Sequence, residues 1–100
     1  MIFDPVNLLK FKPEIKQQPY LKEWIDRLGN QIDVLHTKNF TRNEKGDYCP
    51  SSLEEGIIDY TWIFEWLKNN RKDTIIIREE IQPKNSEKDV RYIKDLWASY

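Results

Sequence analysis

The stretch IDVLHTKNF (residues 32–40) decides the fold, because its apolar residues form a short run that ends on the only histidine of the chain. Residues 32 to about 38 are predicted to form a strand, and Thr37, Lys38 and Asn39 follow His36 at once. A polar cluster at the end of a buried strand is unusual, because a buried strand favours β-branched and apolar residues. The cluster therefore raises the question of function.

Two further short apolar runs are predicted to be strands. The first precedes Asp4-Pro5, where proline removes a backbone donor and keeps the preceding residue extended, so the strand ends there. The second is TIIIREEI (residues 74–81), which is rich in β-branched isoleucine and ends in two carboxylates.

Each predicted strand is followed by a segment with helical spacing of its apolar residues. In the first helix Leu21, Trp24, Ile25 and Leu28 share a face, and Gly29 is expected to close it as a left-handed cap. Three strand–helix units in succession predict an α/β fold of parallel strands joined by right-handed crossovers.

The second helix is predicted within YTWIFEWLKNN (residues 60–70), with Asp59 as its N-cap, after a long polar loop at residues 41–56. Ser86 and Asp89 are expected to frame the start of the last helix, which carries Val90, Ile93 and Trp97.

Length and composition restrict the classes of function. One hundred residues allow a single small domain, and 16 Lys and Arg against 17 Asp and Glu give a net charge of −1, so nucleic acid is not an expected partner. No apolar segment approaches the ~20 residues that cross a bilayer, so no membrane partner is expected. Cys49 is the only cysteine and is interpreted as an ordinary loop thiol, and a reducing, cytoplasmic location is expected.

Asp4, His36 and the pair Glu79-Glu80 all fall at predicted strand ends. In a parallel α/β sheet these ends lie on one side of the molecule, so the side chains are expected to share a cleft. Two carboxylates and an imidazole form a mixed oxygen and nitrogen set suited to Mn²⁺, Co²⁺, Zn²⁺ or Mg²⁺.

Each of these residues also has a purely structural interpretation. Asp4 could shape a turn, His36 could be a hydrogen-bonded structural residue, and the glutamates could be solvated or paired with Arg78 or Lys84. Alternation along the strand puts Ile75, Ile77 and Glu79 on one face, so Glu79 is the preferred ligand and Glu80 the fallback.

Nearly the whole chain resembles the C-terminal part of the sugar phosphate isomerase/epimerase family, the xylose isomerase-like TIM barrels. The resemblance rests on FDPVNLL (residues 3–9), IDVLHTKNF, EEGIIDYTWIFEWLKNN (residues 54–70) and TIIIREEI. Members typically carry an Asp-Pro-x-Asn strand end, a V-H-x-K-D strand end, a G-x-G-x-I-D-[WYF] helix entry and an apolar strand ending in glutamate. This chain would then be the last three βα units of a (β/α)8 barrel.

The resemblance implies a divalent metal held by one acidic or histidine residue from each of four strands. Asp4, His36 and Glu79 match three of these ligands, and Glu79 also matches the catalytic acid/base. Lys38 and Asn7 match motif positions assigned to binding a sugar or sugar phosphate. In such a site the metal stabilises the charge that develops when a carboxylate removes a proton beside a carbonyl or hydroxyl oxygen.

The chain departs from the family pattern at three positions. Asn39 replaces an aspartate, Glu54 replaces the first glycine of G-x-G, and Arg78 interrupts an apolar strand. A full barrel also needs eight units and typically about 250 residues. We therefore expect a fragment, or a piece that works with a missing N-terminal barrel portion or other chains and is inactive alone.

Two alternatives belong to other classes. A non-catalytic remnant could bind a partner through its exposed sheet edge and helix faces. The DNA-repair endonuclease branch of the same barrel architecture uses more histidine ligands and a basic groove, and one histidine with a net charge of −1 speaks against it.

Overall fold

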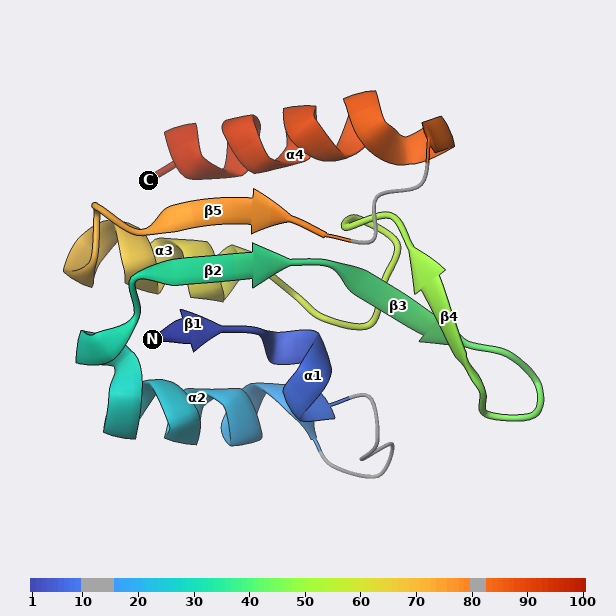
Figure 1. The fold of residues 1–100 in the computed structure, drawn as a ribbon, viewed down its shortest axis with the longest axis horizontal. Helices are drawn as coiled ribbons and strands as arrows, with labels where there is room; N and C mark the ends of the chain where they lie inside the picture. The colour runs from blue at the N-terminus through green and yellow to red at the C-terminus, as the bar shows by residue number, and fades with distance from the viewer. Residues whose placement is uncertain (10–15, 80–82) are drawn as a thin grey trace.

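Three short parallel strands form the centre of the fold (Figure 1). The computed structural model describes residues 1–9, 16–79 and 83–100. Strands β1 (Ile2–Phe3), β2 (Val34–Thr37) and β5 (Ile75–Arg78) pair in the order β1-β2-β5, and both pairings are parallel. The predicted mixed α/β fold with a parallel sheet is confirmed at this level.

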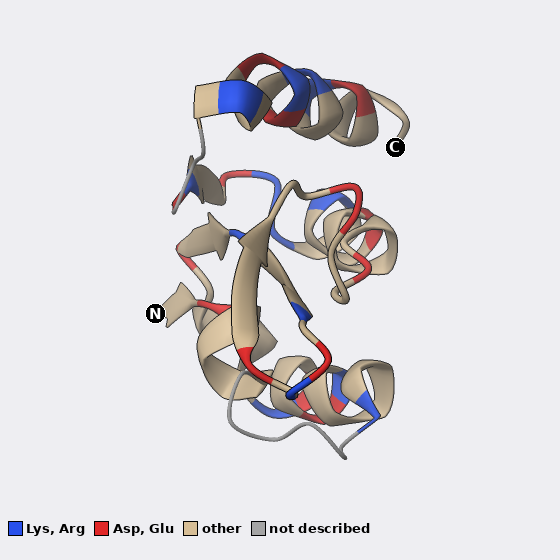
Figure 2. Ribbon diagram, turned by 90° about the vertical axis from the view of Figure 1, so that its right-hand side faces the viewer, with Lys and Arg blue, Asp and Glu red and all other residues tan. Residues whose placement is uncertain are grey.

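Helices cover one face of this sheet. Helix α3 (Thr61–Asn70) lies behind β2 and β5 in Figure 1, and α2 (Gln17–Leu28) and α4 (Ser86–Ala98) flank the sheet. The short helix α1 (Pro5–Leu9), which the sequence pattern did not predict, follows β1 directly, and two 3-10 turns, η1 (Gly29–Gln31) and η2 (Pro83–Asn85), complete the helical elements described. Both α2 and α4 carry a mixture of basic and acidic residues (Figure 2).

The two faces of the sheet differ sharply in burial. Phe3 and Leu35 are register partners that face the helices, and both belong to the hydrophobic core. Their neighbours Ile2 and Ile75 point to the opposite face and are 59% and 61% exposed. The sheet therefore has one packed face and one open apolar face.

No helix in the described parts of the chain is both long and apolar enough to pass through a bilayer.

The prediction of a left-handed cap at Gly29 is wrong. Gly29 has φ −55° and ψ −36°, an ordinary right-handed helical conformation, and it begins η1. A Cβ atom at this position would overlap the indole ring of Trp66 on α3. Glycine is required here for close packing between helices and not for its backbone freedom.

The prediction of a long polar loop at residues 41–56 is also wrong. Strands β3 (Asn39–Arg42) and β4 (Tyr48–Ser51) form an antiparallel hairpin that contains Cys49 in β4. Gly46, at φ 83°, makes the turn, and the rings of Phe40 and Tyr48 stack with centroids 5.1 Å apart. A cross-strand aromatic pair of this kind stabilises a hairpin whose other residues are polar.

The helix α3 begins one residue later than expected, and Asp59 still serves its first turn. The Asp59 carboxylate accepts bonds from the backbone N–H of Thr61 at 2.9 Å and from the Thr61 hydroxyl at 2.6 Å. The prediction of Asp59 as the N-cap is therefore wrong, because the N-cap is Tyr60, and Asp59 binds Thr61 from just outside the helix.

Asn39 is buried and holds the segment that leads into α3. Its Nδ2 donates to the carbonyl oxygens of Leu53 at 2.9 Å and Ile58 at 2.8 Å, and its Oδ1 accepts from the Ile58 N–H at 2.9 Å. Gly56 lies directly against this side chain, and a Cβ there would overlap it. Residue 39 is therefore asparagine and not aspartate for a physical reason, because a carboxylate cannot donate hydrogen bonds to two carbonyl oxygens.

We predict that Asn39→Asp lowers the free energy of unfolding by about 3 kcal/mol, since a buried carbonyl that loses its donor costs about 1–3 kcal/mol. Urea unfolding followed by tryptophan fluorescence measures the change. The matched control is Asn30→Asp, at an exposed residue of η1, which should change stability by less than about 0.5 kcal/mol. Equal stability of Asn39→Asp and the wild type would contradict the assigned role of Asn39.

Candidate metal centre

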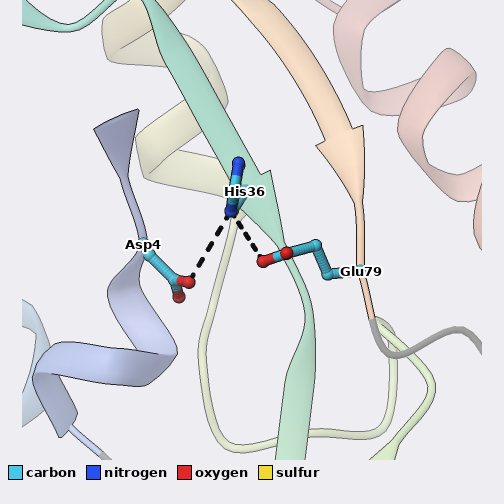
Figure 3. Close-up of side chains that lie close together, drawn as sticks. All are labelled: Asp4, His36 and Glu79. Atoms are coloured by element: carbon cyan, nitrogen blue, oxygen red, sulfur yellow. Dashed lines mark ion pairs between the residues drawn. The ribbon is translucent and has the colours of Figure 1, made fainter. Parts of the chain in front are cut away.

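The three predicted ligands lie together at the carboxyl ends of the parallel strands (Figure 3). Asp4 follows β1, His36 is the third residue of β2, and Glu79 follows β5. One ligand atom from each lies within 4.8 Å of the others. The structure therefore brings these side chains to one place, and their role as metal ligands stays a prediction.

The imidazole of His36 lies between the two carboxylates. Its Nδ1 is 2.6 Å from Glu79 Oε1 and 3.8 Å from Asp4 Oδ2. The side chains of Asp4 and His36 are 12% and 20% exposed, and that of Glu79 is 36% exposed. The cluster is thus shielded on the β1 and β2 side and open on the β5 side.

Lys38 supplies the positive charge of the cluster. Its Nζ lies 3.0 Å from Asp4 Oδ2 and 3.4 Å from Glu79 Oε1, and the side chain is only 8% exposed. Burial alone would lower the pKa of Lys38, but hydrogen bonding and attraction from Asp4 and Glu79 outweigh burial and raise its pKa above the ordinary value. The lysine predicted to contact substrate thus bridges the two carboxylates.

Glu79 shows the complementary effect. Partial burial would raise the pKa of Glu79, but electrostatic attraction and hydrogen bonds from Lys38 and His36 outweigh burial and lower the pKa below the ordinary value. Glu79 is therefore held in its ionised form, which is the form that binds a cation. Glu80, the fallback ligand, lies outside the described residues.

Asp4 is fixed by the first turn of α1. The backbone N–H of Asn7 donates to Asp4 Oδ1 at 3.2 Å, and the Asn7 side-chain amide donates to Oδ2 at 2.8 Å. Pro5 opens the helix, where its missing N–H has no cost. Asp4 therefore has both the turn-shaping role considered from the sequence and a place in the cluster, and Asn7, predicted to bind substrate, binds Asp4 in this structure.

The backbone of Lys38 is held by Tyr60, which the sequence analysis did not single out. The buried Tyr60 hydroxyl donates to the Lys38 carbonyl at 2.6 Å and accepts from its N–H at 3.2 Å. Burial raises the pKa of Tyr60, so the hydroxyl stays protonated and can make both bonds. The only sequence signal for this role of Tyr60 was that it is an aromatic residue with a polar hydroxyl group near the start of a predicted helix.

Arg78 fixes the strand ends from the opposite face of the sheet. Its guanidinium pairs with Asp89 of α4 at 2.7 Å, and the two side chains are 6% and 0% exposed. It also donates to the carbonyl oxygens of Thr37 and Ser51, both at 3.3 Å, and to that of Glu79. Arg78 thus ties together the ends of β2, β4 and β5, which explains an arginine inside an apolar strand.

We predict that Asp89→Ala lowers the free energy of unfolding by about 3–5 kcal/mol, because it leaves the buried Arg78 charge without its partner. Urea titration checks this value. Asp95→Ala, at an exposed residue of the same helix, is the control and should lie within about 0.5 kcal/mol of the wild type. Equally small losses of unfolding free energy in both variants would show that the Arg78–Asp89 ion pair does not hold the strand ends.

We also predict that ionisation of Glu79 makes the free energy of unfolding depend on pH in the acidic range. Because folding lowers its pKa from 4.5, its ionised form stabilises the fold above that pH, and this contribution is lost as pH falls through the lower folded value. The difference in unfolding free energy between wild type and Glu79→Gln should therefore shrink between pH 7 and pH 3. Lys38, His36 and Asp4 face this carboxylate and are unchanged in both proteins. Glu65→Gln, at an exposed residue of α3, should show no such trend, and a pH-independent difference for Glu79→Gln would contradict the prediction.

Comparison of the chain with protein-family models, with curated proteins and with solved structures gives no match.

Proposed function

We propose that the chain is part of a divalent-metal-dependent sugar or sugar phosphate isomerase or epimerase of the xylose isomerase-like type. The observation that supports this proposal best is the meeting of Asp4, His36 and Glu79 at the ends of three adjacent parallel strands. Active sites of α/β barrels are built at this end of the strands from residues far apart in the sequence. We place the protein in the cytoplasm.

The donor set fits a divalent cation. Two carboxylate oxygens and one imidazole nitrogen suit Mn²⁺, Co²⁺, Mg²⁺ or Zn²⁺ better than a thiolate-preferring ion. The position already attracts positive charge, since the Lys38 ammonium lies against both carboxylates. Three protein ligands also leave coordination positions for a further ligand and a substrate.

The residues around the site have separate chemical tasks in this proposal. When bound, the metal would act as a Lewis acid toward neighbouring oxygens of the sugar. Glu79, held ionised and partly open to solvent, would take and return the proton on the adjacent carbon. Lys38 and Asn7 carry N–H donors at the same edge and would orient the hydroxyl or phosphate oxygens of the substrate.

The open sheet face supports placing these strands in a larger barrel. Ile75 and Ile77 of β5 are 61% and 42% exposed, and they share a face with Glu79. In a closed barrel such a face is filled by side chains from the other strands. A depression of 270 Å³ beside β1, lined largely by apolar residues such as Ile2, Leu8 and Trp24, would similarly receive a neighbouring unit. We therefore propose further βα units, on this or another chain, as partners that complete the enzyme.

A non-catalytic, partner-binding module is the second candidate. It is favoured by the fact that Lys38 forms ion pairs with both carboxylates. The same open face would then bind a partner, and the cluster would be a structural ion-pair network.

Metal-dependent stability separates these candidates. Mn²⁺ at ten times its dissociation constant should raise the melting temperature of the 100-residue chain by roughly 5–10 °C, by mass action on the folded state. Asp4→Asn and Glu79→Gln should each abolish the shift, and Glu65→Gln should retain it. Differential scanning calorimetry provides the measurement. An unchanged wild-type melting temperature in millimolar Mn²⁺, Co²⁺, Mg²⁺ and Zn²⁺ would favour the partner-binding module.

A further inference from the structure

We infer that Lys38 is a built-in competitor for the metal: its ammonium group occupies the cation position of the site and sets how tightly a divalent ion binds. This inference rests on the proposed metal centre. It assigns to Lys38 a role in metal affinity that is separate from contact with substrate.

The competition follows from shared acceptor atoms. Lys38 Nζ lies 3.0 Å from Asp4 Oδ2 and 3.4 Å from Glu79 Oε1. The same two oxygen atoms face His36 Nδ1, and one atom from each of these three residues forms the candidate ligand set. An ion that bound this set would meet the ammonium at close range, so the two cations cannot hold these oxygens together without strong repulsion.

The ammonium group is also kept near the site. Tyr60 binds both the N–H and the carbonyl of Lys38, which fixes the point from which the side chain starts. The Lys38 side chain is 8% exposed and its chain of methylenes is surrounded by protein, so solvent screens its charge only weakly. Metal binding must therefore displace the ammonium by rotation about the side-chain bonds.

Such a tethered cation has two effects on the chain. Without metal it prevents repulsion between the Asp4 and Glu79 carboxylates and keeps the strand ends together. With metal it lowers the affinity, because part of the binding free energy is used to break the two ion pairs. The site is then stable when empty and binds its metal reversibly.

Calorimetric titration with Mn²⁺ at pH 7.5 tests this role in the full chain. Lys38→Met removes the charge and keeps much of the side-chain volume, and it should tighten Mn²⁺ binding about tenfold, as expected for loss of one cation near the ion. Lys38→Arg retains the charge and should stay within about threefold of wild type. Lys22→Met, at an exposed residue of α2, is the control and should leave the affinity unchanged.

The outcomes distinguish failure of this inference from failure of the metal centre. If the wild type binds Mn²⁺ and Lys38→Met binds it equally or more weakly, the competition is refuted and the metal centre stands. If no protein in the series binds Mn²⁺, the metal centre itself is refuted, and the inference with it.

A second measurement needs no variant and remains available if Lys38→Met does not fold. In wild-type protein, Mg²⁺ should shift the carbon-13 resonance of the Lys38 Cε toward that of exposed lysines, in step with occupancy of the site. A Lys38 resonance that stays fixed while Mg²⁺ saturates the protein would overturn the inference.

Discussion

The parallel pairing of β1, β2 and β5 is the constraint on which the rest of the structure depends. Because the three strands run the same way, the residues that follow each strand emerge at one edge of the sheet. That edge receives two carboxylates, an imidazole and an ammonium group, whose charges must balance at close range. Ion pairs at the strand ends therefore hold the side chains of the site close to one another.

Two buried polar residues outside the cluster keep that geometry fixed. Arg78 joins the ends of β2 and β5 to α4 through Asp89, and Asn39 holds the segment that enters α3. Tyr60 then connects α3 back to Lys38. Buried polar groups are costly unless every donor and acceptor is used, so this arrangement specifies one position for the strand ends.

The three parallel strands and the convergence of the site residues could be predicted from the sequence, because both depend on local patterns. Short apolar runs that end at Asp4, His36 and Glu79 indicate strands, and parallel geometry brings their ends together. What depends on tertiary contacts could not be predicted. The hairpin is stabilised by the stacked rings of Phe40 and Tyr48, Gly29 is required by the ring of Trp66, and the guanidinium of Arg78 depends on a carboxylate in another helix. The bridging position of Lys38 was missed for the same reason, since it depends on residues that follow three different strands, β1, β2 and β5.

We propose that this edge of the sheet is a binding site for a divalent cation. Crystals of the chain grown with Mn²⁺, with diffraction recorded at the manganese absorption edge, test it most directly. We expect one strong anomalous peak coordinated by Asp4, His36 and Glu79, with the Lys38 ammonium moved away from both carboxylates. An undisturbed Lys38 bridge with no peak at this edge, in crystals that contain millimolar Mn²⁺, would contradict it.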